Sequence, residues 1–367
     1  MNRLKSWLLR QSSLPQKFDI PAQIAQRLRG SPIVIADVGA AFGTDPRWSP
    51  INQLVHFVTF EPDPRSSLPD SEQTTNFATG LGAEPGRKTL HLTALPAASS
   101  VYEINHGYLD DFAVRDWLKN VGQSEIPIDT LDHCLESAGK TDLSFLKVDT
   151  EGSDLDILRG ATSALDRSIL GVEVEVTFAP RHRGAPFFAD IDAFLRDHGF
   201  QLHTLEKEHW LRNNLTFGSN VNPQLIWGDA VYFLTYERLC ERLAEQSSTE
   251  VTLTMTKLIL LLLGYGFHDY AVDLIEKTQH DGFLNAELAS GLRAAIRGSV
   301  RGHVKYFAAA GCRLLVLTLA LLPSLPVRRI RSRIWNDLWR LIGNVSYEVS
   351  RLARRTGIRG ACITEIS

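Results

Sequence analysis

The sequence predicts an α/β fold in which a mostly parallel sheet is flanked by helices and followed by an all-helical C-terminal appendage. The apolar run 33–38 breaks abruptly into Asp37-Val38-Gly39-Ala40-Ala41-Phe42-Gly43, which is typical of a buried strand entering a glycine-rich turn. Strand-like and helix-like segments then alternate up to about residue 238, as they do in parallel sheets. From about residue 249 the apolar spacing becomes helical.

The first predicted strand and its turn lead directly into a helix, because Asp45 is placed to cap it and Pro46 suits its first turn. The next predicted strand, 56–61, ends in Glu61, about 20 residues beyond the first glycine, where a carboxylate typically binds ribose hydroxyls. The glycine spacing alone also fits a ligand-free turn, since it lacks the full dinucleotide fingerprint. Glu61 shifts the interpretation towards adenosine binding.

Acidic residues also follow the predicted strand 143–148, where Asp149 and Glu151 precede a helix with a predicted capping box at Ser153. Because the carboxyl ends of parallel strands open into the ligand crevice, these two acids are the catalytic candidates. Their spacing places both on one side of an extended backbone. Lys147 could pair with either acid, and a purely structural ion pair stays open as the alternative.

Later segments are expected to complete the sheet. The strands are predicted at 170–176, 200–205 and 229–234, with a helix at 187–198. The loop 178–186 is expected at the cleft mouth, where Arg181 and His182 would either meet an anionic acceptor or simply be solvated. Trp210 and Trp227 suit a sugar ring and core packing equally well.

These segments together resemble the FkbM-type methyltransferases, which use S-adenosylmethionine on a class I Rossmann-like fold. The resemblance covers about residues 30–235, and one departure is Ala41-Phe42, where family members commonly carry an Asn. The matching stretches are DVGAAFG (37–43), FEPDP (60–64), TGLGAEPGRKTL (79–90), SSV (99–101), IPIDTLDHCL (126–135), FLKVDTEGSDLDILRGA (145–161) and GVEVEV (171–176).

The resemblance implies a cofactor site and a reaction. The two glycines of the turn would let the backbone approach the cofactor, Asp37 would steady the turn or accept from the ammonium group, and Glu61 would hold the ribose diol. Methylation of an alcohol needs a proton acceptor beside the aligned oxygen, which Asp149 or Glu151 would supply. The implied cofactor-binding set is Asp37, Gly39, Gly43, Glu61, Gly80 and Leu81. No His or Cys cluster indicates a metal, and we expect none.

Length and composition predict an intracellular enzyme of more than one domain. The 367 residues divide into a helical segment 1–29, a Rossmann-like domain 30–238 and a helical region 249–367. Residues 1–10 lack the apolar core and cleavage site of a secretory signal. The four cysteines lie far apart and form no C-x-x-C pair, which indicates reduced thiols and a cytoplasmic location.

The C-terminal region is strongly basic although the chain carries a net charge of -3. Residues 301–360 contain twelve Lys or Arg against two acids, which indicates contact with an anionic partner, either a membrane surface at the inner face of the cell membrane or the acidic domain of the same chain; a solvated charged face is the alternative. The apolar run 314–322 is shorter than the ~20 residues that span a bilayer, so a buried helix and an interfacial helix both stay open. We expect no nucleic-acid partner.

The predicted function is S-adenosylmethionine-dependent O-methylation of a hydroxyl on a sugar, as in a surface glycan or glycolipid, or on a natural product. One alternative is a non-catalytic cofactor-binding scaffold that docks through its basic C-terminal helices. The other is a nicotinamide-dependent sugar oxidoreductase, which the incomplete glycine fingerprint and the absence of a Tyr-x-x-x-Lys pair disfavour.

Overall fold

The computed structural model describes residues 22–41, 43–66, 71–112, 118–213 and 223–298. Nearly all of them belong to the first of two compact units, which comprises Met1–Pro15 and Ile20–Ala294. The second unit comprises Gln16–Asp19 and Ala295–Ser367. The predicted N-terminal segment before residue 22 and the basic region 301–360 lie outside the described residues, so the membrane contact stays a prediction.

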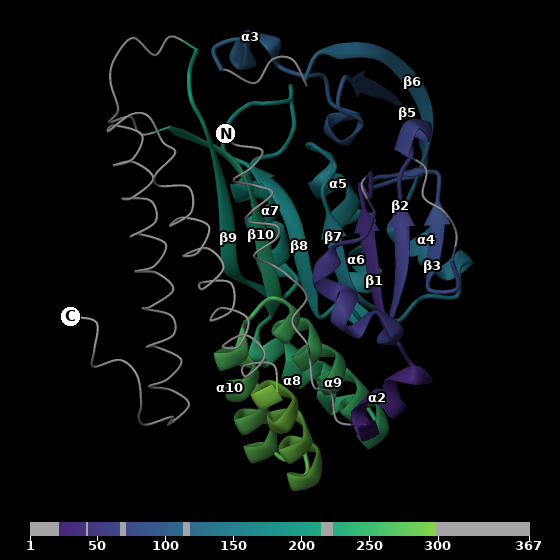
Figure 1. Ribbon diagram of the computed structural model, residues 1–367, viewed down its shortest axis with the longest axis vertical. Helices are drawn as coiled ribbons and strands as arrows, with labels where there is room; N and C mark the ends of the chain where they lie inside the picture. The colour runs from purple at the N-terminus through teal and green to yellow at the C-terminus, as the bar shows by residue number, and fades with distance from the viewer. Residues whose placement is uncertain (1–21, 42, 67–70, 113–117, 214–222, 299–367) are drawn as a thin grey trace, which may run out of the picture. The chain divides into compact units, whose positions relative to one another are not determined.

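A seven-stranded, mostly parallel sheet forms the centre of the first unit (Figure 1). The strand order is β3-β2-β1-β7-β8-β10-β9, and β10 runs antiparallel to both of its neighbours. The predicted α/β fold class is confirmed. The strands are β1 (Ile33–Val38), β2 (Val55–Phe60), β3 (Thr74–Phe77), β7 (Leu143–Val148), β8 (Gly171–Thr177), β9 (Phe200–Trp210) and β10 (Gln224–Leu234).

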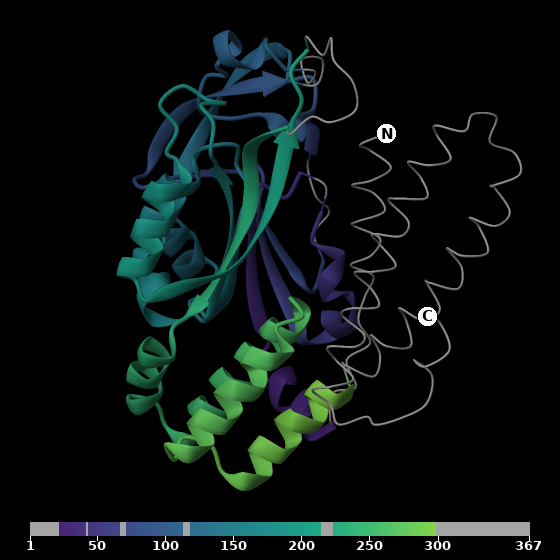
Figure 2. The same ribbon diagram turned by 90° about the vertical axis from the view of Figure 1, so that its left-hand side faces the viewer.

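Helices cover both faces of this sheet because the crossovers run in opposite directions from β1. Between β7 and β9 the chain forms α5 (Asp154–Arg159), α6 (Thr162–Arg167) and α7 (Phe188–Asp197), of which α5 and α7 contact β8. In Figure 2 these teal helices lie on one side of the sheet, and the purple segment η1 (Pro46–Leu54) lies on the other.

The helix predicted after the glycine turn is a 3-10 segment instead of an α-helix. Asp45 caps it as expected, since its Oδ1 accepts the backbone N–H of Arg47 at 2.7 Å. Pro50 lies inside η1 and Ile51 adopts non-helical torsions. Proline has no N–H and clashes with the preceding turn, so an α-helix cannot continue across this position.

A second, three-stranded sheet is inserted between β3 and β7, with the order β4-β6-β5. It consists of β4 (Gly80–Leu81), β5 (Gly86–Thr93) and β6 (Asn120–Asp129), followed by α4 (Leu131–Ser137). The short element η2 (Pro64–Ser66) lies between β2 and β3, and η3 (Pro96–Ala98) and α3 (His106–Leu109) lie between β5 and β6. Leu90, Ile126 and Ile128 form its apolar cluster.

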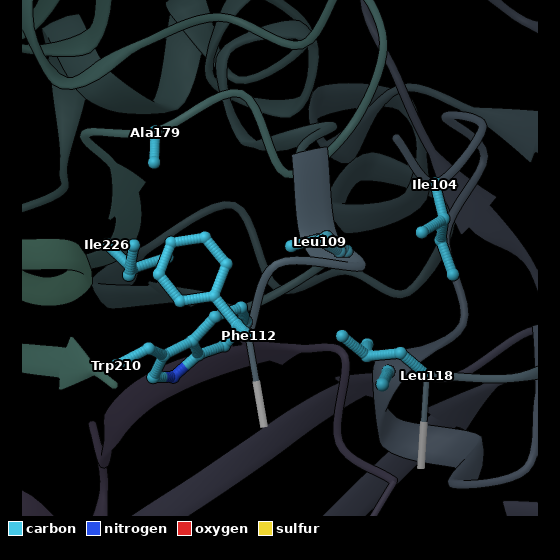
Figure 3. Packing of buried hydrophobic residues seen from close by; sticks show 8 residues of the cluster. Ile104, Leu109, Phe112, Leu118, Ala179, Trp210 and Ile226 are labelled. Atoms are coloured by element: carbon cyan, nitrogen blue, oxygen red, sulfur yellow. The ribbon is translucent and has the colours of Figure 1, made fainter. Parts of the chain in front are cut away.

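A separate apolar cluster joins the inserted segment to the ends of β9 and β10 (Figure 3). Trp210 belongs to this cluster, is 8% exposed and packs edge-to-face on Phe112 at 6.0 Å between ring centroids. Of the two interpretations of Trp210, the structure therefore supports core packing. The other members of the cluster are Ala98, Ile104, Leu109, Leu118, Ala179 and Ile226.

Helices follow the sheet, as predicted, and one of them packs back onto it. After α8 (Tyr236–Ala244) come α9 (Ser248–Gly264) and α10 (His268–His280), joined by a tight turn, and residues 286–298 are also helical. The apolar residues 258–263 of α9 are fully buried, and α9 contacts β7. Among the residues that the structure describes, no helix has both the length and the hydropathy to span a bilayer.

Candidate active site

A cleft opens where β1, β2 and β7 end, at the edge of the sheet where open α/β folds bind their ligands. Four of the six predicted cofactor-binding residues line it, namely Gly39, Glu61, Gly80 and Leu81. Asp149 lines it as well, whereas Asp37, Gly43 and Glu151 do not.

Gly39 brings the turn after β1 against the turn after β7. Its φ of +86° belongs to the left-handed region, and a Cβ atom at this position would lie 1.9 Å from the carbonyl oxygen of Asp149. The Asp149 N–H also donates to the carbonyl of Val38 at 3.0 Å. Only glycine permits this approach, which brings the backbone of Asp149 against the turn after β1.

Glu61 presents its carboxylate to the cleft from the end of β2. Its Oε1 accepts the backbone N–H of Asp63 at 2.8 Å. Burial raises the pKa of Glu61 to about 7, although the Asp63 N–H and the nearby Arg65 oppose this shift. A carboxylate at this position suits a ribose diol, whose two hydroxyls donate to its oxygens.

The inserted sheet supplies an apolar wall to the same cleft. Leu81, Leu90, Ile126 and Ile128 line it, together with Val101. Such a wall suits the flat face of a purine, because apolar surface is removed from water on both sides. The cleft thus combines a carboxylate for a diol with an apolar pocket for a ring.

Lys147 links two of the predicted acids. Its Nζ lies 3.1 Å from Oδ1 of Asp37 and 3.7 Å from Oδ2 of Asp149. Burial raises the pKa of Asp37, which is 2% exposed, while Lys147 opposes the shift. Burial also disfavours the charge on Lys147, yet Asp37, Asp149 and Glu173 hold its pKa above the usual range. Asp37 is thereby committed to an ion pair, whereas the Asp149 side chain is 40% exposed.

Glu151 lies behind the cleft in a buried ion network. It is 7% exposed, and its Oε2 lies 2.8 Å from Nη1 of Arg181, which also pairs with Glu175. Burial raises the pKa of Glu151 and Arg181 opposes it. The backbone of Glu151 has a φ of +56°, an uncommon conformation for a residue with a side chain. Arg181, 2% exposed, is therefore neither a solvated loop residue nor open to an acceptor.

Asp154 was missed by the sequence reasoning, which assigned the capping role to Ser153. The carboxylate of Asp154 accepts the N–H of Thr150 at 3.2 Å, the hydroxyl of Thr150 at 3.0 Å and the N–H of Gly152 at 3.0 Å. Ser153 makes no capping bond to the backbone of α5. Burial raises the pKa of Asp154 to about 7. The available signal was an acidic residue just after a glycine turn, where it can satisfy free N–H groups.

Ser99 and Ser100, which match the family's serine pair, also line the cleft. Ser100 donates to the carbonyl of Glu151 at 2.7 Å, and Ser99 accepts from the backbone N–H of Thr93 at 3.2 Å. The Ser100 hydroxyl thus ties the inserted segment to the turn after β7, whereas the Ser99 hydroxyl forms its bond within the inserted segment. Among the described residues no three His, Cys, Asp or Glu side chains are arranged to hold a metal ion.

Fold and site together define a Rossmann-like protein with a cleft at the carboxyl ends of β1, β2 and β7. Residues 37–202 match the family model of the methyltransferase FkbM domain. This match confirms the predicted resemblance and supports methyl transfer as the type of reaction.

Two further comparisons give little more. No curated protein matches the chain significantly. Among solved structures, one similar chain is a protein from Pyrococcus horikoshii described as a candidate RNA methyltransferase, with 12% identity and a TM-score of 0.27. The similarity covers 64% of this chain and 100% of that one. At so low a TM-score it carries no argument about fold or substrate.

Proposed function

We propose that the protein is an S-adenosylmethionine-dependent O-methyltransferase that acts on a hydroxyl of a sugar or a natural product. The observation that carries the proposal is the single cleft that joins Glu61, an apolar pocket and Asp149 within an FkbM methyltransferase domain. These three features correspond to what the reaction requires: a group that binds the ribose, a pocket that holds the adenine and a proton acceptor.

The residues of the cleft fit this cofactor. Glu61 would accept the ribose hydroxyls, and Leu81, Ile126 and Ile128 would border the adenine. Gly39 keeps the backbone close to the β7 turn, so the methionine part would lie between the ends of β1 and β7. The bound cofactor would supply an electrophilic methyl group on its sulfonium. The protein itself must orient the acceptor oxygen and remove its proton.

Asp149 is the better of the two candidate bases. It lines the cleft and its side chain is 40% exposed, so an acceptor hydroxyl can reach it. Glu151 is buried and engaged by Arg181, which suits it to hold the turn instead. Lys147, 3.7 Å from Asp149, would help to hold this carboxylate in place.

Calorimetric titration of the purified protein with S-adenosylhomocysteine tests the proposal, with NAD as the competing ligand and Glu61→Ala as the control variant. We expect micromolar binding of S-adenosylhomocysteine that is lost in Glu61→Ala, and none of NAD. Binding of NAD alone would instead support a nicotinamide enzyme.

Cellular function separates an enzyme from a scaffold. A scaffold would bind S-adenosylhomocysteine and keep its cellular function when Asp149 becomes Asn, whereas an enzyme would lose it. Docking of residues 301–360 on an anionic membrane is part of the proposal, and binding of the full chain to anionic against neutral vesicles tests it.

A further inference from the structure

A polar layer crosses the face of the sheet that η1 and α9 cover. Asp37, Lys147 and Glu173 are paired in register on the adjacent strands β1, β7 and β8. Paired residues on neighbouring strands point to the same face of a sheet, so the three side chains form one row. Glu173 is 7% exposed and must find donors, because a buried carboxylate without them is costly.

Two donors reach Glu173 from outside the sheet. The Tyr265 hydroxyl donates to its Oε2, and Nη1 of Arg47 lies 3.1 Å from the same oxygen. The guanidinium of Arg47 also lies over the Tyr265 ring, 4.1 Å from its centre. Tyr265 therefore holds Glu173 with its hydroxyl and Arg47 with its ring.

Arg47 connects this group to the glycine turn. Its backbone N–H donates to Oδ1 of Asp45 at 2.7 Å, and its Nε donates to Oδ2 of Asp45 at 2.9 Å. Asp45 follows Gly43 by two residues, so these bonds join Arg47 to the chain at the end of the turn that begins at Gly39. Any side chain that restrains Arg47 thus restrains the turn.

Tyr265 comes from a part of the chain beyond the matched family domain. It follows α9 in the turn that joins α9 to α10, and its ring packs on Trp48 at 5.8 Å and on Phe145 at 5.3 Å. A Cβ atom on the preceding Gly264 would lie 2.6 Å from the Trp48 ring. The turn can approach η1 this closely because residue 264 is a glycine.

We infer that Tyr265 is a positioning residue for the proposed cofactor site, acting through Glu173 and Arg47 on the turn 39–45. Without the Tyr265 hydroxyl, Glu173 has only Arg47 as a donor from outside the sheet and is free to turn towards Lys147, its neighbour in register. Its contact with Arg47 is then weakened. The inference rests on the proposed function. It makes the helical turn after α9 a part of the cofactor site, although no residue of that turn lines the cleft.

Binding of S-adenosylhomocysteine by the full chain tests the inference. We expect Tyr265→Phe to weaken binding about fivefold, which corresponds to about 1 kcal/mol. We expect Tyr265→Leu to weaken it further because the contact with Arg47 is lost as well. Tyr270→Phe is the matched control, since the Tyr270 hydroxyl also donates to the sheet, to the Leu234 carbonyl at 3.2 Å, but touches no member of the polar layer.

A double-mutant cycle separates positioning from general loosening. Arg47→Met should weaken binding on its own, and in that background Tyr265→Phe should have no further effect. Independent effects of the two substitutions, an unaffected Tyr265→Phe variant, or equal weakening by Tyr270→Phe would each overturn the inference. A wild-type protein that binds no S-adenosylhomocysteine would overturn the proposed function first, and the inference with it.

Discussion

The buried ion network behind the cleft predicts that Arg181 is one of the residues most important for stability. Replacing Arg181 with Met keeps the length and the apolar stem of the side chain but leaves Glu151 and Glu175 without their cation. Both carboxylates are buried, at 7% and 5% exposure. Removing one partner of a buried ion pair costs about 3–5 kcal/mol. Since natural domains have only ~5–15 kcal/mol of stability, the loss should be large.

Urea unfolding followed by circular dichroism measures this loss. Arg183→Met, two residues along the same loop, is the control, because Arg183 pairs with Glu103 at 3.8 Å and both side chains are more than half exposed. An exposed pair of this kind contributes ~0–1 kcal/mol. A second variant that combines Arg181→Met with Glu175→Gln should recover part of the stability, because one uncompensated charge is removed.

The loss should also depend on pH in a defined direction. Burial raises the pKa of Glu151 and Glu175 in the folded protein, and Arg181 opposes that shift, so its removal raises both pKa values further. The folded variant then binds more protons than the unfolded chain, and its stability falls as pH rises. The difference in free energy of unfolding between wild type and the variant should therefore become smaller as the pH is lowered from about 8 to about 5. Equal destabilisation by Arg181→Met and Arg183→Met, or a difference independent of pH, would refute the reasoning.

Three further predictions concern the cleft. Gly39→Ala should lose well over ~1 kcal/mol of stability in thermal melting, because it places a Cβ atom 1.9 Å from the Asp149 carbonyl oxygen at a φ of +86°. Asp149→Asn should lower kcat by ~100-fold or more while the affinity for S-adenosylhomocysteine changes little, because only the proton acceptor is removed; a loss of affinity alone would contradict this. Burial raises the pKa of Glu61 to about 7, so the affinity of the protein for S-adenosylhomocysteine should fall as the pH drops through this value. In titrations of the Glu61→Gln variant, this affinity should no longer depend on pH.

The fold could be predicted because its signals are local. Two patterns indicated the fold: a β-branched run that is followed by glycines, and an acid at the end of the next strand. Each pattern reflects the backbone geometry of its own segment and can be recognised without knowledge of the rest of the chain. The 3-10 form of the predicted helix has an equally local cause, because Pro50 has no N–H and excludes a continuous α-helix. The role of Asp154 in the turn was likewise within reach of the capping rules.

Pairings across the sheet could not be predicted in the same way. Asp149 and Glu151 have the same chemistry and lie two residues apart, yet one lines the cleft and the other is buried against Arg181. The difference arises from the positive φ of Glu151, which turns its side chain away from the position that an extended backbone would give it. Arg181 lies 30 positions further on, and nothing in the spacing of a loop residue predicts its burial.

Two ion networks contact the turn at the end of β7 from different sides. Arg181 holds the turn from behind through Glu151, and Lys147 holds it from the sheet through Asp37, so the exposed carboxylate between them, Asp149, is fixed from both sides. As the proposed base, Asp149 would otherwise sample several rotamers at the end of the strand, and a misplacement of about 1 Å is enough to slow a reaction strongly. The two ion networks thus hold the turn that carries Asp149, which gives the buried acids beside it a role in positioning this exposed carboxylate.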